Sequence, residues 1–351
     1  MRRIPVSADR EYNVDIDVLF QPALEELSKD RSRVGVFFSQ SMESSIPKFE
    51  SGDTEFFYFP IPDGEAGKSA ATLQSSWNWL GAAGFTRSDL IIGIGGGAVT
   101  DFAGFVAATW LRGVDWIAVP TTIAGMVDAA IGGKTGINSD YGKNLVGAFY
   151  SPISVLIDPS WIETLSDRDF AAGLAEVIKC GFIKDEEILR ILNGSTLEQV
   201  RASTEITLEL IERSVRVKAN VVSGDFKESF EREALNYGHT FGHAVELHSK
   251  YSLRHGECVS IGLSFIAHLA VQVGVMSQEL LAQHLAILRG MGLPTSYPHS
   301  HWPDLLASMK LDKKSRGNSL RFVVISEIGK TQRLENPNES DMIAAYEKVS
   351  Q

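Results

Sequence analysis

The stretch SDLIIGIGGGAVTDFAGFVAATWLRG, residues 88–113, decides the fold of the first half of the chain. It reads as an apolar strand, three adjacent glycines from Gly95 to Gly97, and then a helix. Glycine lets the backbone turn sharply and approach a phosphate, while a helix amino terminus offers N–H donors and a positive dipole. We therefore expect a nucleotide-binding strand–loop–helix unit. Because G-x-G-x-x-G is only partly present, a tight connection without a ligand is the alternative.

The segments around this stretch extend the same pattern. Short β-branched runs occur at residues 33–40, 54–62, 114–122 and 154–159, separated by helix-like segments. This alternation predicts an α/β domain with a mainly parallel sheet over residues 1–165. After Ser166, which begins a capping box with Asp169, apolar residues recur at helical spacing. We expect a mainly α-helical domain over residues 166–351, with a small hairpin at 319–335 and a terminal helix at 340–350.

The composition excludes several classes of protein. The formal charge of -11 and the pI near 5.3 argue against nucleic acid or an anionic membrane as partner. Cys180 and Cys258 are the only cysteines, so a disulfide-stapled scaffold is excluded. No apolar run is long enough to span a membrane, and the first residues, MRRIPVSADREY, lack the apolar core of a signal peptide. We expect a cytoplasmic protein.

A second glycine-rich stretch contains two lysines. Gly133, Lys134 and Thr135 spell the end of a Walker motif, but Asp128 stands where the motif demands glycine, so an ATP-binding loop is excluded. Lys134 and Lys143 are expected in glycine-rich turns after a strand end, where ligands of open α/β sheets bind. The alternative is that they are solvated surface lysines.

The segment ALNYGHTFGHAVELHSKYSLRHGE, residues 234–257, raises the question of a metal site. His239 and His243 are four residues apart and share a helix face, as a pair of imidazole ligands would, and His255 follows sixteen residues after His239. The segment is not H-E-x-x-H. Histidines satisfied by hydrogen bonds are the alternative. The remaining histidines are interpreted as structural; these are His248, His268, His284, His299 and His301.

The candidate carboxylate ligand is Glu176. It falls on an apolar helical stretch, where a buried carboxylate costs several kcal/mol unless it is paired or metal-bound. Lys179, three residues on, could be its partner instead of a metal.

Taken together, these motifs resemble the 3-dehydroquinate synthases of the wider sugar-phosphate cyclase group, from about Asp63 to Lys314. The resemblance rests on ordered motifs at residues 95–113, 119–122, 127–138, 142–150, 173–179, 235–246 and 255–262. It implies a dehydroquinate synthase-like fold, in which an α/β NAD-binding domain is joined to the helical domain and the active site lies in the cleft.

The resemblance also implies roles for individual residues. Zinc, or another divalent ion such as Co²⁺, would be held by Glu176, His239 and His255, which leaves His243 for the substrate phosphate and proton handling. The residues implied for NAD are Asp63, Glu65, Lys68, Gly96, Gly97, Asp101, Thr121, Thr122, Lys134, Lys143, Glu163 and Thr164. Those implied for substrate are Asp128, Lys134, Asn144, Lys179, Lys218, Arg232, Asn236 and His243, with either Lys313 or Lys314.

Two further features follow from the resemblance. Arg112 matches an arginine that, in the family, reaches across a homodimer interface into the active site of the neighbouring subunit. Ser39 and Gln40 stand where many members carry an aspartate for the adenosine ribose, and either side chain can still bond a ribose hydroxyl.

The implied activity is conversion of 3-deoxy-D-arabino-heptulosonate 7-phosphate to 3-dehydroquinate and phosphate in the shikimate pathway. The steps are transient NAD-dependent oxidation, phosphate elimination, re-reduction and aldol ring closure, which makes the enzyme a carbon–oxygen lyase of aromatic amino-acid biosynthesis. Three alternatives stay open: a related cyclase such as an amino-dehydroquinate synthase, a metal-dependent polyol dehydrogenase, and a non-catalytic metal-binding module.

Overall fold

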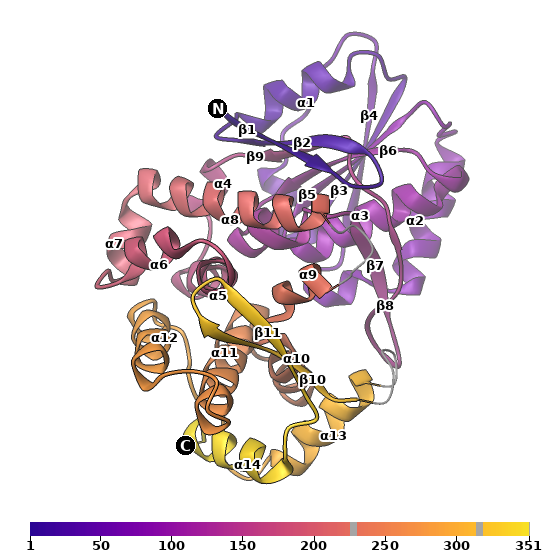
Figure 1. Ribbon diagram of the computed structural model, residues 1–351. Helices are drawn as coiled ribbons and strands as arrows, with labels where there is room; N and C mark the ends of the chain where they lie inside the picture. Colours follow the sequence, from indigo (N-terminus) through magenta and orange to yellow (C-terminus); the bar gives the residue numbers. More distant parts are fainter. Residues whose placement is uncertain (225–229, 314–318, 351) are drawn as a thin grey trace. The chain divides into compact units, whose positions relative to one another are not determined.

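The structure is a computed structural model that describes residues 1–224, 230–313 and 319–350. The chain divides into two compact units (Figure 1). Unit 1 comprises Met1–Leu165 and Lys218–Phe226, and unit 2 comprises Ser166–Val217 and Lys227–Gln351. The carboxy-terminal end of one long helix, α8 (Thr204–Gly224), therefore belongs to unit 1, although α8 begins in unit 2. None of the helices within the described ranges is long and apolar enough to cross a membrane.

Unit 1 is built on a seven-stranded sheet in the order β1-β2-β9-β6-β5-β3-β4. All neighbouring strands are parallel except β1 and β2, so the predicted mainly parallel sheet is confirmed. Its strands are β1 Arg2–Ser7, β2 Glu11–Ile16, β3 Arg33–Ser39, β4 Glu55–Ile61, β5 Leu90–Gly95, β6 Asp115–Pro120 and β9 Ser154–Ile157. Its helices include α1 Phe20–Ser28, α2 Ala70–Ala82, α3 Gly97–Thr109 and α4 Ser160–Glu163. Strands β5 and β9 are buried at every residue, as expected when both faces of a parallel sheet are covered.

The glycine loop joins β5 to α3, as the sequence predicted. A Cβ atom at Gly93 would lie 2.7 Å from the Cβ of Ala103, and one at Gly95 would lie 2.5 Å from a methyl group of Val99. These distances are far below van der Waals contact, so glycine is needed for α3 to lie this close to β5.

The expectation that Lys134 and Lys143 lie in turns is wrong. Both lie on strands, Lys134 in β7 (Lys134–Ser139) and Lys143 in β8 (Gly142–Phe149), which pair as an antiparallel hairpin. The glycines suggested turns, but a Cβ at Gly147 would lie 2.2 Å from the carbonyl oxygen of Thr135. Glycine serves here to let two strands approach closely.

Unit 2 is mainly helical and carries the predicted small hairpin and terminal helix. Its helices are α5 Asp167–Ile183, α6 Glu186–Leu192, α7 Leu197–Ala202, α8 Thr204–Gly224, α9 Phe230–Glu233, α10 His239–His248, α11 His255–Gln272, α12 Gln278–Gly290, α13 Trp302–Lys313 and α14 Glu339–Lys348. Its antiparallel strands are β10 Arg321–Glu327 and β11 Lys330–Glu335. Ser166 begins α5 as predicted, because its side chain accepts a hydrogen bond from the backbone N–H of Asp169.

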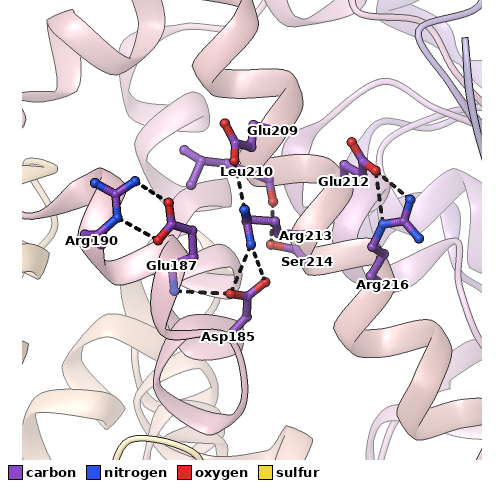
Figure 2. A network of polar contacts seen from close by, with 9 residues as sticks. All are labelled: Asp185, Glu187, Arg190, Glu209, Leu210, Glu212, Arg213, Ser214 and Arg216. Atoms are coloured by element: carbon purple, nitrogen blue, oxygen red, sulfur yellow. Dashed lines mark hydrogen bonds and ion pairs between the residues drawn. The ribbon is translucent and has the colours of Figure 1, made fainter.

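Charged side chains fix α8 relative to α6 (Figure 2). Asp185 caps α6 by accepting a hydrogen bond of 3.1 Å from the backbone N–H of Glu187. The same carboxylate lies 3.2 Å from the guanidinium of Arg213 on α8, which also contacts Glu209 at 3.0 Å. Partly exposed pairs of this kind contribute about 0–1 kcal/mol each, so their main effect is to fix position.

Glycines also bring the backbones of α5, α10 and α11 into contact. A Cβ at Gly256 would lie 1.7 Å from the carbonyl oxygen of Ala172 on α5. A Cβ at Gly262 would lie 2.0 Å from the carbonyl oxygen of Gly238, the residue before α10. Since these contacts are with backbone atoms, side-chain rotation cannot relieve them. The spacing of the three helices therefore depends on glycine at both positions.

We predict that Gly256→Ala lowers the free energy of unfolding by about 3 kcal/mol or more, because the added methyl forces α11 away from α5. Urea unfolding followed by circular dichroism measures this change. The control is Gly81→Ala on α2, where the nearest atom to the added Cβ is 3.4 Å away. That change should be neutral or slightly stabilising, because alanine favours helix. Equal stability of both variants would contradict the packing role of Gly256.

Candidate active site

Three side chains of the kinds that bind metal ions meet in unit 2. Glu176 lies in the middle of α5, His239 is the first residue of α10, and His255 is the first residue of α11. The Glu176 Oε1 atom lies 3.3 Å from His239 Nε2 and 3.2 Å from His255 Nε2. Tetrahedral zinc with bonds of about 2.0–2.1 Å places its ligand atoms about 3.3 Å apart. The distances from Glu176 to both imidazoles therefore match a tetrahedral divalent cation, which three protein ligands would leave with one further position to fill.

Glu176 uses its two oxygens for different partners. Its side chain is 1% exposed, and Oε2 contacts the ammonium group of Lys179, one turn along α5, while Oε1 faces the two imidazoles. Burial alone would raise the pKa of Glu176, but Lys179 and His239 hold it well below its usual range. The sequence left open whether a metal or Lys179 is the partner of this carboxylate, and the geometry provides for both.

The backbone and a second carboxylate orient the two imidazoles. His239 Nδ1 lies 3.1 Å from the carbonyl oxygen of Tyr237, to which it donates when Nε2 carries the free lone pair. His255 Nδ1 lies 3.6 Å from Oε2 of Glu246, a buried residue of α10. Burial would lower the pKa of His255, but Glu176 and Glu246 raise it to about 10. The two carboxylates therefore favour positive charge beside His255, whether from a proton or from a bound cation.

His243 lies one turn after His239, with ring centroids 5.3 Å apart. A ring nitrogen of His243 lies within 4.8 Å of ligand atoms of Glu246 and His255. The corresponding group around Glu176 is formed with His239 and His255. The ring of His243 reaches solvent. Desolvation by the surrounding protein lowers the pKa of His243, and His239 and His255 lower it further. The lowered pKa favours the neutral imidazole, in which one ring nitrogen can accept a hydrogen bond.

The other candidates of unit 2 lie on neighbouring elements. Arg232 is 3% exposed in α9, and Asn236 ends the 3-10 helix Ala234–Asn236 that leads into α10. Lys313 is the last residue of α13. Lys314 lies outside the described residues.

In unit 1, several residues expected to bind NAD form one polar network. Lys68 is buried, and its ammonium lies 2.6 Å from Asp101 and contacts the Asn144 side chain. Glu65 accepts a hydrogen bond of 2.7 Å from Asn138 and pairs with Lys143 at 3.1 Å. The network joins α3, the β7–β8 hairpin and the segment between β4 and α2.

The carboxylates of this network differ in acidity. Burial raises the pKa of Asp101, and Lys68 offsets this only in part. Burial would also raise the pKa of Glu65, but Lys68 and Lys143 outweigh it and lower that pKa. Glu65 is therefore the carboxylate held charged by its two lysines.

Asp128 and Lys218 form a second cluster in unit 1. Asp128 lies in a π-helical turn, Gly125–Ala129, and its Oδ1 is 2.6 Å from the Lys218 ammonium, which also contacts the Asp128 backbone carbonyl. Lys134, at the start of β7, has an exposed side chain.

The expected cofactor residues at the strand ends are adjacent. Thr121 N donates to Gly95 O at 2.9 Å, which joins the carboxyl ends of β5 and β6. Gly96, Gly97 and Thr122 follow directly, at the edge where open α/β sheets bind ligands. Two other expected residues have local structural contacts: Asp63 accepts a hydrogen bond of 2.7 Å from Ser41, and Thr164 donates one of 2.7 Å to Trp161 O. Glu163 ends α4 with an exposed side chain.

Glu246 and Asn138 were not predicted from the sequence. Glu246 stands seven residues after His239, two helical turns along the same face, so helical periodicity could have found it. For Asn138 there was no such signal, because its partner Glu65 is far away in the sequence.

Comparison with known proteins identifies a family. Residues 58–172 match the model of the 3-dehydroquinate synthase N-terminal domain, and residues 173–315 match that of the C-terminal domain. The 3-dehydroquinate synthase of Streptomyces avermitilis is 50% identical over 291 residues, covering 83% of this chain and 80% of the relative. The 3-dehydroquinate synthase of Corynebacterium efficiens is 47% identical over 351 residues, covering 99% of this chain and 92% of the relative.

Solved structures share the fold. The 2-epi-5-epi-valiolone synthase from Streptomyces hygroscopicus with NAD⁺ and Zn²⁺ bound is 27% identical, with a TM-score of 0.87 and 98% and 97% of the two chains covered. A 2-deoxy-scyllo-inosose synthase complexed with carbaglucose-6-phosphate, NAD⁺ and Co²⁺ is 23% identical, with a TM-score of 0.87 and 98% of each chain covered. At 23% identity, the likeness to the 2-deoxy-scyllo-inosose synthase shows the fold alone. The two family models match both halves of the chain, and the two named 3-dehydroquinate synthases are 47–50% identical over most of its length. The chain therefore belongs to the 3-dehydroquinate synthase family.

Proposed function

We propose that this protein converts 3-deoxy-D-arabino-heptulosonate 7-phosphate to 3-dehydroquinate and phosphate, with NAD and a divalent cation as cofactors. The observation that carries the proposal is the pairing of Glu176 with two imidazoles on one oxygen and with Lys179 on the other. The solved 2-epi-5-epi-valiolone synthase, which is 27% identical and has the same fold, carries NAD⁺ and Zn²⁺, which supports both cofactors. When bound, NAD would take and return a hydride at one alcohol carbon while the cation polarises its oxygen, which acidifies the neighbouring C–H.

The residues of this chain would handle the charge and the protons of the reaction. Glu176, His239 and His255 hold the cation. His243 is assigned to the substrate phosphate, where its imidazole can exchange a hydrogen bond or a proton with the departing group. Lys179 and Arg232 are buried cations, which stabilise developing negative charge far better than cations in water do.

Unit 1 would bind the cofactor and further charged groups of the substrate. The polar network of Glu65, Lys68, Asp101 and Lys143 and the strand ends at Gly96, Gly97, Thr121 and Thr122 are assigned to NAD, with Asp63, Lys134, Glu163 and Thr164. Asp128, Lys134, Asn144 and Lys218 are assigned to substrate, as is Asn236 with Lys313 or Lys314 of unit 2.

The substrate is tested by a phosphate-release assay with a catalytic amount of NAD. The heptulosonate phosphate and its amino analogue are supplied separately, and the carbocyclic product is identified by mass. We expect turnover of the first without accumulation of NADH. Preference for the amino analogue would indicate an amino-dehydroquinate synthase, and stoichiometric NADH would indicate a dehydrogenase.

Glu246 is proposed to position the metal ligand His255. Glu246→Gln removes the charge beside His255 Nδ1, and we predict that it weakens cation binding by about 10–100-fold. Competition with a chromophoric chelator measures the affinity. The control is Glu257→Gln, a buried carboxylate of α11 that pairs instead with Arg168 at 2.6 Å. Equal affinity of Glu246→Gln and the unmodified protein would remove this role.

Arg112 is proposed to act in a homodimer of a cytoplasmic enzyme. Leu111, Arg112 and Gly113 all have positive φ angles, of 48°, 66° and 122°, and Arg112 is exposed. Left-handed backbone at two non-glycine residues costs about 1–2 kcal/mol each, and such strain concentrates at functional sites.

We predict that Arg112→Ala lowers turnover by about a hundredfold without changing the unfolding transition, because an exposed cation that completes a neighbouring site is lost. Dissociated Arg112→Ala and His239→Ala chains, reassociated together, should recover about a quarter of full activity, since half of the dimers would contain one intact site. No recovery above the separate variants would show that Arg112 acts within its own chain.

A further inference from the structure

We propose a second divalent-cation site in unit 2, formed by His248, His301 and Asp304. From the sequence, both histidines are interpreted as structural and Asp304 is not singled out, so the proposed site gives the three residues a different role. The site is separate from Glu176, His239 and His255, shares no residue with them, and does not depend on the proposed function.

The three side chains converge from the end of α10 and from the start of α13, with His301 directly before that helix. One ligand atom from each lies within 4.8 Å of the other two. His248 Nε2 is 3.9 Å from Asp304 Oδ2, and the rings of His248 and His301 have centroids 4.4 Å apart. The Asp304 side chain is 72% exposed, so rotation can bring its oxygen to the spacing of about 3.3 Å that tetrahedral zinc requires.

Local structure places each ligand. His248 is the last residue of α10, and its Nδ1 lies 2.8 Å from the hydroxyl of Tyr297. A Tyr297 oxygen that accepts the Nδ1 proton leaves the Nε2 lone pair directed toward Asp304, which is the usual arrangement behind a metal-bound histidine. Tyr297 is itself fixed, because its backbone N–H donates to the carbonyl oxygen of Val349 at 2.7 Å.

The start of α13 supplies the other two ligands. Ser300 has a φ of 84°, a left-handed turn that directs the chain into α13. The carbonyl oxygen of His301 accepts from Leu305 N at 3.0 Å, so His301 stands at the helix start, with Asp304 three residues later on the same face.

The donor set selects the kind of cation. Two imidazoles and one carboxylate suit Zn²⁺, Ni²⁺ or Cu²⁺, whereas Mg²⁺ and Ca²⁺ prefer oxygen ligands. Because Asp304 is exposed, the ion would exchange with solvent and bind more weakly than at the buried Glu176. A bound ion would link the end of α10 to the start of α13 and so stabilise the folded unit.

The test titrates Zn²⁺ into protein whose tight site is already filled. Isothermal titration calorimetry compares the unmodified protein with His301→Ala, Asp304→Asn and the control His299→Ala. His299 is a neighbouring histidine that stacks on Tyr346, with centroids 6.5 Å apart, and does not belong to the cluster.

We expect the unmodified protein and His299→Ala to bind one further Zn²⁺ per chain and to melt at a higher temperature in its presence. His301→Ala and Asp304→Asn should lose both effects while keeping the tightly bound cation, the folded-state circular dichroism spectrum and normal turnover. The proposal is overturned if the unmodified protein binds no further ion, or if both ligand variants bind it as the unmodified protein does. Because turnover is measured separately, failure of this site and failure of the proposed activity give different results.

Discussion

His239→Ala is expected to abolish tight cation binding and to lower turnover by at least about a thousandfold. His239 Nε2 is one of the two imidazole nitrogens within 3.3 Å of Glu176 Oε1, so its removal leaves only two of the three donors. Loss of a single group that stabilises developing charge already costs about 10²–10³ in rate, and here the cation itself would be lost. Metal analysis after gel filtration through a chelating buffer, with a phosphate-release assay, measures both effects.

The matched control is His268→Ala, which removes a histidine from α11, the helix that begins with His255. This variant should keep the tight cation and most of its activity. If His239→Ala retained the cation and turned over normally, the assignment of the metal site to Glu176, His239 and His255 would be wrong.

The second large effect is expected for Lys179→Met. Lys179 and Glu176 are each 1% exposed, so removing the ammonium leaves a buried carboxylate without its cation. Breaking a buried ion pair in this way costs about 3–5 kcal/mol. We therefore expect metal-free Lys179→Met to lose about that much free energy of unfolding. Part of it should return when Zn²⁺ is added, because the ion compensates the same carboxylate.

The double variant Glu176→Gln, Lys179→Met separates charge from packing. Because it removes both buried charges, its free energy of unfolding without metal should exceed that of Lys179→Met alone. Chemical unfolding of the metal-free proteins gives the comparison. If Lys179→Met were as stable as the unmodified protein, Lys179 would not be the partner that compensates Glu176.

The sequence predicted those parts of the fold and site that depend on local patterns. The β5–Gly–α3 unit followed from an apolar run, adjacent glycines and a helical period. Glu176 was singled out because a carboxylate in an apolar helix needs a partner, and the structure buries it beside Lys179 and two imidazoles. In both cases, residues close together in the sequence were enough for the prediction.

The remaining features depend on contacts between distant segments. The glycine-rich stretches around Lys134 and Lys143 suggested turns, but the close approach of Gly147 to Thr135 is visible only when β7 and β8 are paired. His248 and His301 are separated by α11 and α12, so no spacing rule could bring them together. The resemblance to a family supplied residue roles that neither periodicity nor composition could provide.

The most direct test of the proposed activity uses protein stripped of both dinucleotide and metal. Phosphate release from the heptulosonate phosphate is followed as NAD and Zn²⁺ are added back, alone and together. The proposal predicts negligible release with neither or only one, and full turnover with both, while the total amount of NADH stays below the amount of enzyme. Full-speed release of phosphate from the stripped protein would contradict it.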